Sequence, residues 1–252
     1  MISAASISSA RLLSFARSFA SFDFGSKSFW QKFYADRQRD HGDHRPFEWF
    51  IDDDAASDLV AKKCREMFAS SSSSSTPQQL RMLHVGCGTS ALGTEVVRKM
   101  HPFAPQVFEV DYEASCLDAA QLRARALLEK ESISCLSWFQ ADARRLPRQW
   151  NNQFDVIVDK GTLDAMVFAG QKEKGATSVK SYASEIRRVS RPSASLYLQF
   201  TDEGPETRLD LLNEAFQVHA NGCDRVGWLD LEPYVDCEGY YLYMVRFSSH
   251  II

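Results

Sequence analysis

The chain has 252 residues, 44% of them hydrophobic and 25% charged, as expected for one large α/β domain or for a medium domain with extensions. The formal net charge of −4 argues against a general nucleic-acid binder, which needs a strongly basic surface. No run approaches the roughly 18 consecutive apolar residues that a membrane-spanning helix requires.

The six cysteines form no CxxC pair and have no histidine at zinc-binding spacing. We therefore expect buried thiols in a reducing compartment, without a disulfide framework and without a metal site. They are Cys64, Cys87, Cys116, Cys135, Cys223 and Cys237.

The first 22 residues, MISAASISSARLLSFARSFASF, contain Arg11 and Arg17, many serines and no acid. Helical spacing would place the later phenylalanines of this segment on one side, close to the arginines. This basic, serine-rich and amphipathic composition is typical of a mitochondrial or plastid transit peptide. We expect residues 1–22 to be a leader that directs the chain to the mitochondrial matrix. A tail without a targeting role is the alternative, and the location would then be cytoplasmic.

Residues 23–69 form an N-terminal arm that is rich in aromatic side chains, as in SFWQKFY and PFEWF. Apolar residues recur at helical spacing over residues 55–69, which predicts a helix there. Residues 70–79, SSSSSSTPQQ, are too polar to pack and indicate a linker. The main domain is expected to cover residues 80–252.

In the main domain, short apolar segments alternate with helical patterns, which predicts a doubly wound, Rossmann-like α/β sheet with helices on both faces. The segments predict five parallel strands and a C-terminal antiparallel hairpin at the sheet edge, which makes seven strands. The parallel strands are expected at 80–85, 106–111, 133–139, 154–159 and 195–200, the hairpin at 223–231 and 239–247, and the helices near 91–100, 114–130, 178–190 and 206–218.

A glycine-rich turn, GCGTSALG, follows the first strand. Gly86 and Gly88 allow a sharp turn and a close approach of the backbone to a ligand, and the following helix offers free N–H groups. A phosphate-binding P-loop is excluded because Thr94 stands where that motif has a lysine. A dinucleotide site is less easily excluded, although Ala91 replaces the third glycine of its fingerprint.

Carboxylates end the next strands at the edge of the sheet where ligands of such folds bind. Asp111 lies roughly 20 residues after the turn and is expected to hold both ribose hydroxyls, which suits NAD and S-adenosylmethionine equally. Asp142 is expected to accept a hydrogen bond from an adenine amino group. Each could instead cap the following helix. Carboxylates without a phosphate-binding lysine favour a phosphate-free, positively charged cofactor, S-adenosylmethionine.

The fourth strand delivers Asp159 to the same edge within FDVIVDKGTLDA. With VGCGTS, EVD and the terminal strands, this stretch resembles the seven-strand (class I) S-adenosylmethionine-dependent methyltransferases. Together with FWQKFY and PFEWF, it resembles the methyltransferase-like branch that modifies protein lysines, including those of elongation factor 1-alpha. Within that branch, LQFTDEGPETRLDLL and the leader most resemble the citrate synthase lysine methyltransferases of mitochondria. The resemblance spans about Phe29 to Phe247.

The resemblance implies S-adenosylmethionine as cofactor and a protein substrate, with citrate synthase favoured. It implies a set of cofactor-binding residues at the strand ends: His84, Gly86, Cys87, Gly88, Asp111, Tyr112, Asp142, Ala143 and Asp159. His84 departs from the pattern, because many relatives have an acid there, near the methionyl part of the cofactor. A neutral imidazole would weaken binding by about 1–3 kcal/mol without abolishing it.

Asp159 and Trp49 are the catalytic candidates. Asp159 would orient the substrate ammonium and accept its proton through water, while Trp49 and Phe50 would close over the sulfonium with their π-faces. Alternatively, these rings only pack the arm against the sheet. Glu48 and Asp164 are further acids near the cleft. The end of the fifth strand, Thr201 to Glu203, would border the substrate channel.

Other functions remain open at this point. The same cofactor could serve a lysine of elongation factor 1-alpha or a small amine. Because of His84, the chain could be a non-catalytic partner protein that only binds the cofactor. An NAD-dependent oxidoreductase is the most distant alternative.

Overall fold

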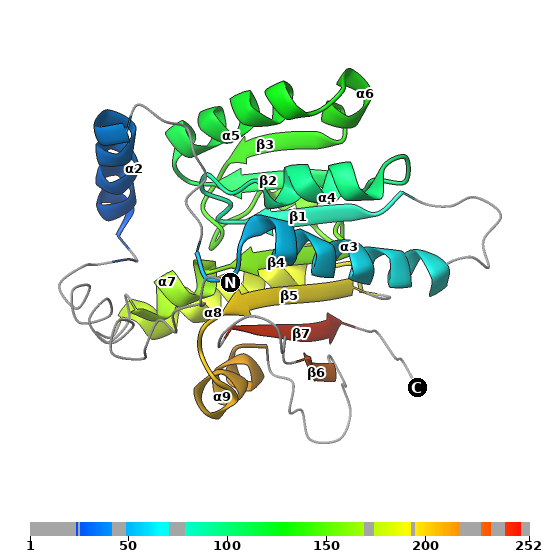
Figure 1. Ribbon diagram of the computed structural model, residues 1–252. Helices are drawn as coiled ribbons and strands as arrows, with labels where there is room; N and C mark the ends of the chain where they lie inside the picture. Colours follow the sequence, from blue (N-terminus) through cyan, green and yellow to red (C-terminus); the bar gives the residue numbers. More distant parts are fainter. Residues whose placement is uncertain are drawn as a thin grey trace, which may run out of the picture.

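A seven-stranded sheet runs through the centre of the molecule, with strand order β3-β2-β1-β4-β5-β7-β6 (Figure 1). The structure is a computed structural model, and it describes residues 24, 26–41, 49–70, 79–168, 174–192, 195–216, 228–232 and 240–247. The strands are β1 (Arg81–Val85), β2 (Gln106–Asp111), β3 (Leu136–Gln140), β4 (Val156–Lys160), β5 (Ser195–Thr201), β6 (Trp228–Glu232) and β7 (Tyr241–Phe247).

The first five strands pair in parallel, and β7 pairs antiparallel with both β5 and β6. The predicted sheet of five parallel strands with an antiparallel pair at its edge is therefore confirmed. The last strand in the chain, β7, lies inside the edge strand β6. β5 is buried at all its positions, as expected for a strand with neighbours on both sides and helices over both faces.

Helices cover both faces of the sheet, also as predicted (Figure 1). They are α2 (Lys27–His41), α3 (Asp53–Ser70), α4 (Leu92–Met100), α5 (Ala114–Leu127), α6 (Lys130–Ile133), α7 (Thr162–Phe168), α8 (Lys174–Val189) and α9 (Pro205–Phe216), with a short 3₁₀ turn at Arg148–Trp150. One core lies between the sheet and α3, α4 and α5, and a second core lies between the sheet and α8 and α9.

The side-chain alternation of each strand assigns its residues to these two cores. On β1, Met82 faces α3 and α4, whereas Leu83 and Val85 face the other core. On β4, Val158 belongs to the first core and Ile157 to the second. The parity of a residue in its strand therefore decides which helices it meets, and this holds for the polar residues at the strand ends too.

Some boundaries differ from the sequence-based expectation. The strand expected from residue 133 begins at Leu136, because Lys130–Ile133 forms the single-turn helix α6, and the preceding helix ends at Leu127. A helix of one turn is too short to show a hydrophobic period. Helix α7 was not predicted, and α2 was recognised only as an aromatic stretch. The leader, most of the linker and residues 223–227 of the hairpin lie outside the described residues.

Helix α3 begins with a side-chain cap. The Asp52 Oδ1 atom accepts a hydrogen bond of 2.8 Å from the backbone N–H of Ala55, and the Asp52 carbonyl accepts one from Ala56. Asp53 and Asp54 in the first turn complement the helix dipole. None of the helices that the structure describes combines the length and apolar character needed to cross a membrane.

The cap predicts a measurable contribution to stability. Asp52→Ala should lower the free energy of unfolding by about 1 kcal/mol, because it leaves N–H groups of the first turn without a partner. Asp52→Asn should restore most of this loss, since asparagine caps helices equally well. Urea denaturation followed by circular dichroism measures both, and equal stability of the alanine and wild-type proteins would contradict the assignment.

Candidate functional site

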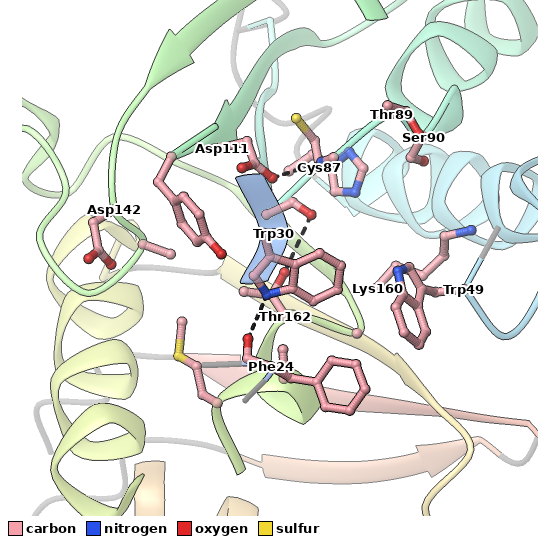
Figure 2. A pocket seen from close by; sticks show the side chains of 18 of the residues that line it. Phe24, Trp30, Trp49, Cys87, Thr89, Ser90, Asp111, Asp142, Lys160 and Thr162 are labelled. Carbon is pink, nitrogen blue, oxygen red and sulfur yellow. Dashed lines mark hydrogen bonds between the residues drawn. The ribbon is translucent and has the colours of Figure 1, made fainter. Parts of the chain in front are cut away.

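A cavity opens at the carboxyl ends of β1, β2 and β4, between the sheet and the N-terminal arm. It encloses about 860 Å³ not filled by protein atoms, including space open to solvent. Most of the predicted site residues line it: Trp49, His84, Gly86, Cys87, Gly88, Asp111, Tyr112, Asp142 and Ala143. Figure 2 shows this cavity with several of these side chains directed into it.

The glycine turn forms the floor of the cavity. Gly86 and Gly88 both have positive φ angles, 60° and 51°, which side chains disfavour. A Cβ atom on Gly86 would overlap Thr162, and one on Gly88 would meet the Tyr34 hydroxyl. Both glycines are therefore required by the backbone conformation and by close neighbours.

Asp111 stands beside this turn at the end of β2. Its Oδ2 accepts a hydrogen bond of 2.9 Å from the Gly88 N–H, and its Oδ1 accepts one of 2.8 Å from Glu113 N–H. Burial raises the pKa of the carboxyl to about 6, although these N–H groups favour the charged form. A carboxylate oxygen has a second lone pair, so Asp111 can still accept hydrogen bonds from a ligand in the cavity.

Asp142 is paired with a side chain of its own chain, which the sequence analysis did not anticipate. The Arg144 side chain donates to both of its carboxylate oxygens, with Nη2 at 2.7 Å from Oδ2 and Nε at 2.9 Å from Oδ1. Burial alone would raise the pKa of Asp142, but Arg144 holds it below its ordinary value. Arg144 also lines the cavity and was not among the predicted residues.

Lys160, which follows Asp159 on β4, faces the arm. Its Nζ is 2.7 Å from Asp53 Oδ1 and donates a hydrogen bond of 2.9 Å to the Ile51 carbonyl. Asp53 also accepts hydrogen bonds from the Ser90 hydroxyl and the Ala91 N–H in the glycine turn. These contacts fasten the start of α3 to both β4 and the turn.

Aromatic side chains of the arm form one wall of the cavity. We call Phe24, Trp30 and Trp49 the aromatic mouth, because their ring centroids lie 5.8–6.3 Å apart around one end of the cavity. The Trp30 indole donates a hydrogen bond to the Phe24 carbonyl, and these rings and Thr162 surround the same end in Figure 2. Tyr34, four residues after Trp30, adds its ring from the same side of α2. This spacing in FWQKFY is a signal that sequence analysis could have used.

His84 lies beneath the glycine turn at the end of β1. An acid, Glu109, lies beside it on the neighbouring strand β2. The Nδ1 atom of His84 is 2.8 Å from Glu109 Oε2, and both side chains are nearly fully buried. Burial alone would lower the pKa of His84, but the charge and hydrogen bond of Glu109 raise it above its ordinary value. The sequence analysis considered His84 by itself, whereas the structure pairs it with the acid of Glu109.

The residues of the cavity suit S-adenosylmethionine. Lys160 and Arg144 are each paired with a carboxylate, which favours a ligand without phosphate groups. Asp111 provides an acceptor for hydroxyl groups beside a turn that admits no side chain, and the aromatic rings that line the cavity favour a cationic ligand. Among the described residues, no three His, Cys, Asp or Glu side chains come together as metal ligands.

Comparison with known proteins agrees with this geometry. Residues 77–220 match a family described as a methyltransferase domain. The chain belongs to the S-adenosylmethionine-dependent methyltransferases. The methyltransferase is 30% identical to the mitochondrial citrate synthase-lysine N-methyltransferase of Danio rerio, over 76% of this chain and 72% of that protein. It is also 30% identical to EEF1A lysine methyltransferase 4 of Mus musculus, over 75% of this chain and 65% of that protein.

Solved structures confirm the fold. The CurJ carbon methyltransferase aligns with a TM-score of 0.57 at 13% identity, over 90% of this chain and 60% of that one. The methyltransferase domain of bacterial CtHen1 aligns with a TM-score of 0.54 at 10% identity, over 78% of this chain and 98% of that one. S-adenosylmethionine is the cofactor of this methyltransferase, as the sequence resemblance implied.

Asp159 does not lie where the sequence analysis placed it. Its side chain does not line the cavity and is fully buried on the α8 face of the sheet. It accepts hydrogen bonds from the Tyr182 and Tyr197 hydroxyls, at 2.5 and 2.9 Å, and from the backbone N–H groups of Thr162 and Leu163. Burial raises the pKa of this carboxyl, although these donors oppose the shift. In this structure, the carboxylate anchors the turn into α7, and its catalytic role remains a prediction.

Other predicted neighbours are also displaced from the cavity. Phe50 packs beside Gly161 and Tyr240 without lining the cavity. Asp164 and Thr201 are buried together, with Thr201 donating to Asp164 at 2.6 Å. Asp202 and Glu203 do not line the cavity, and Glu48 lies outside the described residues. Of the described cysteines, Cys87 lines the cavity, whereas Cys64, Cys116 and Cys135 are free cysteines elsewhere. Cys64, Cys87 and Cys116 are buried as expected, Cys135 is only partly buried, and Cys223 and Cys237 lie outside the described residues.

The position of Asp111 predicts a pH-dependent affinity. Because its pKa is raised to about 6, lowering the pH through about 6 protonates the carboxyl and weakens binding of S-adenosylhomocysteine. Asp111→Asn should weaken binding roughly 10- to 100-fold at neutral pH and remove this part of the pH dependence. Isothermal titration calorimetry measures both, with the exposed Asp118→Asn as control. An unchanged affinity in Asp111→Asn would refute the assignment.

The position of Asp159 predicts a loss of stability. Asp159→Asn should lower the free energy of unfolding by about 1–3 kcal/mol, because an amide nitrogen would face hydroxyl and N–H donors. Tyr182→Phe should cost about 1 kcal/mol through the loss of one of these hydrogen bonds. Thermal denaturation compares the variants. A fully stable Asp159→Asn protein with no methyl transfer would instead support the catalytic role that the sequence suggested.

Proposed function

We propose that this methyltransferase modifies the side-chain nitrogen of a lysine in a protein, and that mitochondrial citrate synthase is the favoured substrate. The observation that carries the proposal is the aromatic mouth, because three rings packed edge-on or at a tilt suit a long aliphatic side chain with a cationic end. The names of the relatives support it, since they refer to lysines of citrate synthase and of EEF1A.

The chemistry requires an uncharged nitrogen. A free lysine has a pKa of about 10.4, so the amine must lose its proton before it attacks. The apolar rings of Trp30 and Trp49 remove water from the amine and thereby favour its neutral form. Since the Asp159 carboxylate faces away from the cavity, the proton is released to water at the aromatic mouth. The bound cofactor supplies an electrophilic methyl group.

Positioning then contributes much of the rate. The walls of the cavity must hold the nitrogen in line with the methyl group at a separation of roughly 3–3.5 Å. Trp49 and Phe24 restrict the lysine from the arm side, and Met166 and Ala165 of α7 also line the cavity. In this proposal the arm selects the acceptor, whereas the glycine turn and Asp111 hold the cofactor.

The proposal includes a location. Residues 1–22 would act as a mitochondrial leader, residues 23–69 as the arm, and residues 80–252 as the methyltransferase domain. The composition of the leader supports transport into the matrix, and the relatives named for citrate synthase are themselves named as mitochondrial. Import of the full chain fused to a fluorescent protein tests the leader, with residues 1–22 deleted as the control.

The decisive experiment measures transfer of labelled methyl groups from S-adenosylmethionine to purified citrate synthase and to a mitochondrial matrix extract. A single labelled protein with the mass of citrate synthase is expected with the full chain, and none with Asp111→Ala. Trp49→Ala should lower kcat/KM for the protein substrate roughly tenfold while S-adenosylhomocysteine binds as in the wild type. Binding without any labelled product would favour a non-catalytic partner protein.

A lysine of elongation factor 1-alpha is the second candidate substrate. It is favoured by the 30% identity to EEF1A lysine methyltransferase 4, which equals the identity to the citrate synthase enzymes. The same assay with purified elongation factor 1-alpha separates the two candidates. Faster labelling of the elongation factor than of citrate synthase would reverse the preference stated here.

A further inference from the structure

A surface groove lies between α8 and residues 141–151, outside the cavity described above. We call it the arginine groove, because Arg145, Arg148 and Arg188 line it. It encloses about 1100 Å³ not filled by protein atoms, including space open to solvent. Arg144, which lines the cavity, directly precedes Arg145, so the cavity and the groove are neighbours along one loop.

Arg188 is held in place by several hydrogen bonds within the chain. Its Nε lies 2.8 Å from Oε1 of Glu185, and its Nη2 lies 2.6 Å from Oε2 of the same carboxylate. Its Nη1 donates to Asn151 Oδ1 at 2.6 Å, and the Leu146 N–H donates to Glu185 Oε2 at 2.7 Å. These contacts fasten the loop to α8, so the groove keeps its shape without a partner protein.

Arg145 and Arg148 differ from Arg188 in having no such partners. Both side chains are exposed, and among the described residues no acid and no hydrogen-bond acceptor contacts either guanidinium. They stand three positions apart on the same side of the groove. All their donors are therefore available, and a guanidinium binds a carboxylate through two parallel hydrogen bonds.

The charge around the groove is opposite to that of the whole chain. The chain has 29 lysines and arginines against 33 acids. Residues 141–151 and α8 together contain seven basic residues and two acids. Both acids, Asp142 and Glu185, are already paired with arginines of this region. The excess of positive charge on this side attracts an acidic partner.

We propose that the arginine groove docks an acidic segment of the acceptor protein, at a distance from the lysine that is methylated. The inference rests on the proposed transfer to a protein. Arg145 and Arg148 would contact carboxylates of that segment, while Arg188 holds the loop on which they stand.

The groove and the cavity lie close enough for one protein to reach both. Arg144 donates to the Ser178 hydroxyl of α8 at 3.4 Å, beside the cavity. Arg188 follows Ser178 by ten residues on the same helix, which corresponds to roughly 15 Å along its axis. A folded acceptor protein is wider than this distance, so its acidic segment and its lysine can bind at the same time.

The chemistry of the groove favours a peptide over other anions. Its lining contains Leu146, which is 3% exposed, and Pro147, so it offers no large exposed apolar side chain for insertion into a membrane. A nucleic acid would extend its phosphate charges beyond the groove, over a chain of net charge −4. A short acidic peptide needs only the local arginines.

Binding of a fluorescent octaglutamate peptide to the full chain tests the groove by fluorescence anisotropy. Arg145→Glu/Arg148→Glu should weaken binding at least roughly tenfold, and added salt should weaken binding to the wild type. The matched control Lys62→Glu/Arg125→Glu changes the net charge equally. Its exposed residues lie on α3 and α5, which cover the other face of the sheet, so it should bind as the wild type does.

The same proteins are compared in methyl transfer to purified citrate synthase and to elongation factor 1-alpha. The groove variant should raise KM for the protein that the wild type labels roughly tenfold, with kcat unchanged. Its affinity for S-adenosylhomocysteine should also stay at the wild-type value, because neither arginine lines the cavity. Arg145→Gln/Arg148→Gln should raise KM less, since it removes the attraction without adding repulsion.

Three results would overturn the docking groove. They are equal KM values for the wild type and the groove variant, an equal rise of KM in the matched control, and tighter binding of oligouridine or phosphatidylserine vesicles than of octaglutamate at the same salt concentration. By contrast, no labelled protein even with the wild type would refute the proposed function itself, so the two failures are distinguishable.

Discussion

The buried ion pair between Lys160 and Asp53 joins the parts of the chain that surround the cavity. The two side chains are 3% and 4% exposed, so each charge would be strongly destabilising without the other. Since Asp53 also accepts hydrogen bonds from Ser90 and Ala91, one carboxylate connects α3, β4 and the glycine turn. The arm cannot detach from the sheet without exposing these groups, and the aromatic mouth depends on the same attachment through Trp49.

Strand parity then places the two neighbouring charged residues at the start of the DKGTLDA segment on opposite faces of the sheet. Lys160 points to the face with α3, whereas Asp159 points to the opposite face, where Tyr182 and Tyr197 surround it. Asp164 is buried as well. Burial raises the pKa of its carboxyl to about 7, against the opposing attraction of Arg208. The acids of the motif stabilise a turn, and Asp111 is the predicted acid beside the glycine turn.

Hydrophobic patterning predicted the sheet, its parallel order and the covering helices, because these depend on local periodicity. It also located Asp111, Gly86 and Gly88, since strand ends and glycine turns have recognisable sequences. It could not show that Glu109 compensates for His84, because the register of β1 and β2 is a non-local property. The burial of Asp159 depended on the same kind of information, namely which helix covers which face. The sequence-based roles of the cavity residues remain predictions.

The matched family region begins at residue 77, yet part of the cavity wall comes from residues before it. Phe24, Trp30 and Trp49 belong to the arm, whereas Gly86 and Asp111 belong to the sheet. Substitutions in the arm can therefore change what reaches the cavity without disturbing the residues beside the glycine turn. Such a division allows an ancestral methyltransferase to acquire new acceptors by divergence of one short terminal stretch, while its cofactor chemistry stays under separate selection.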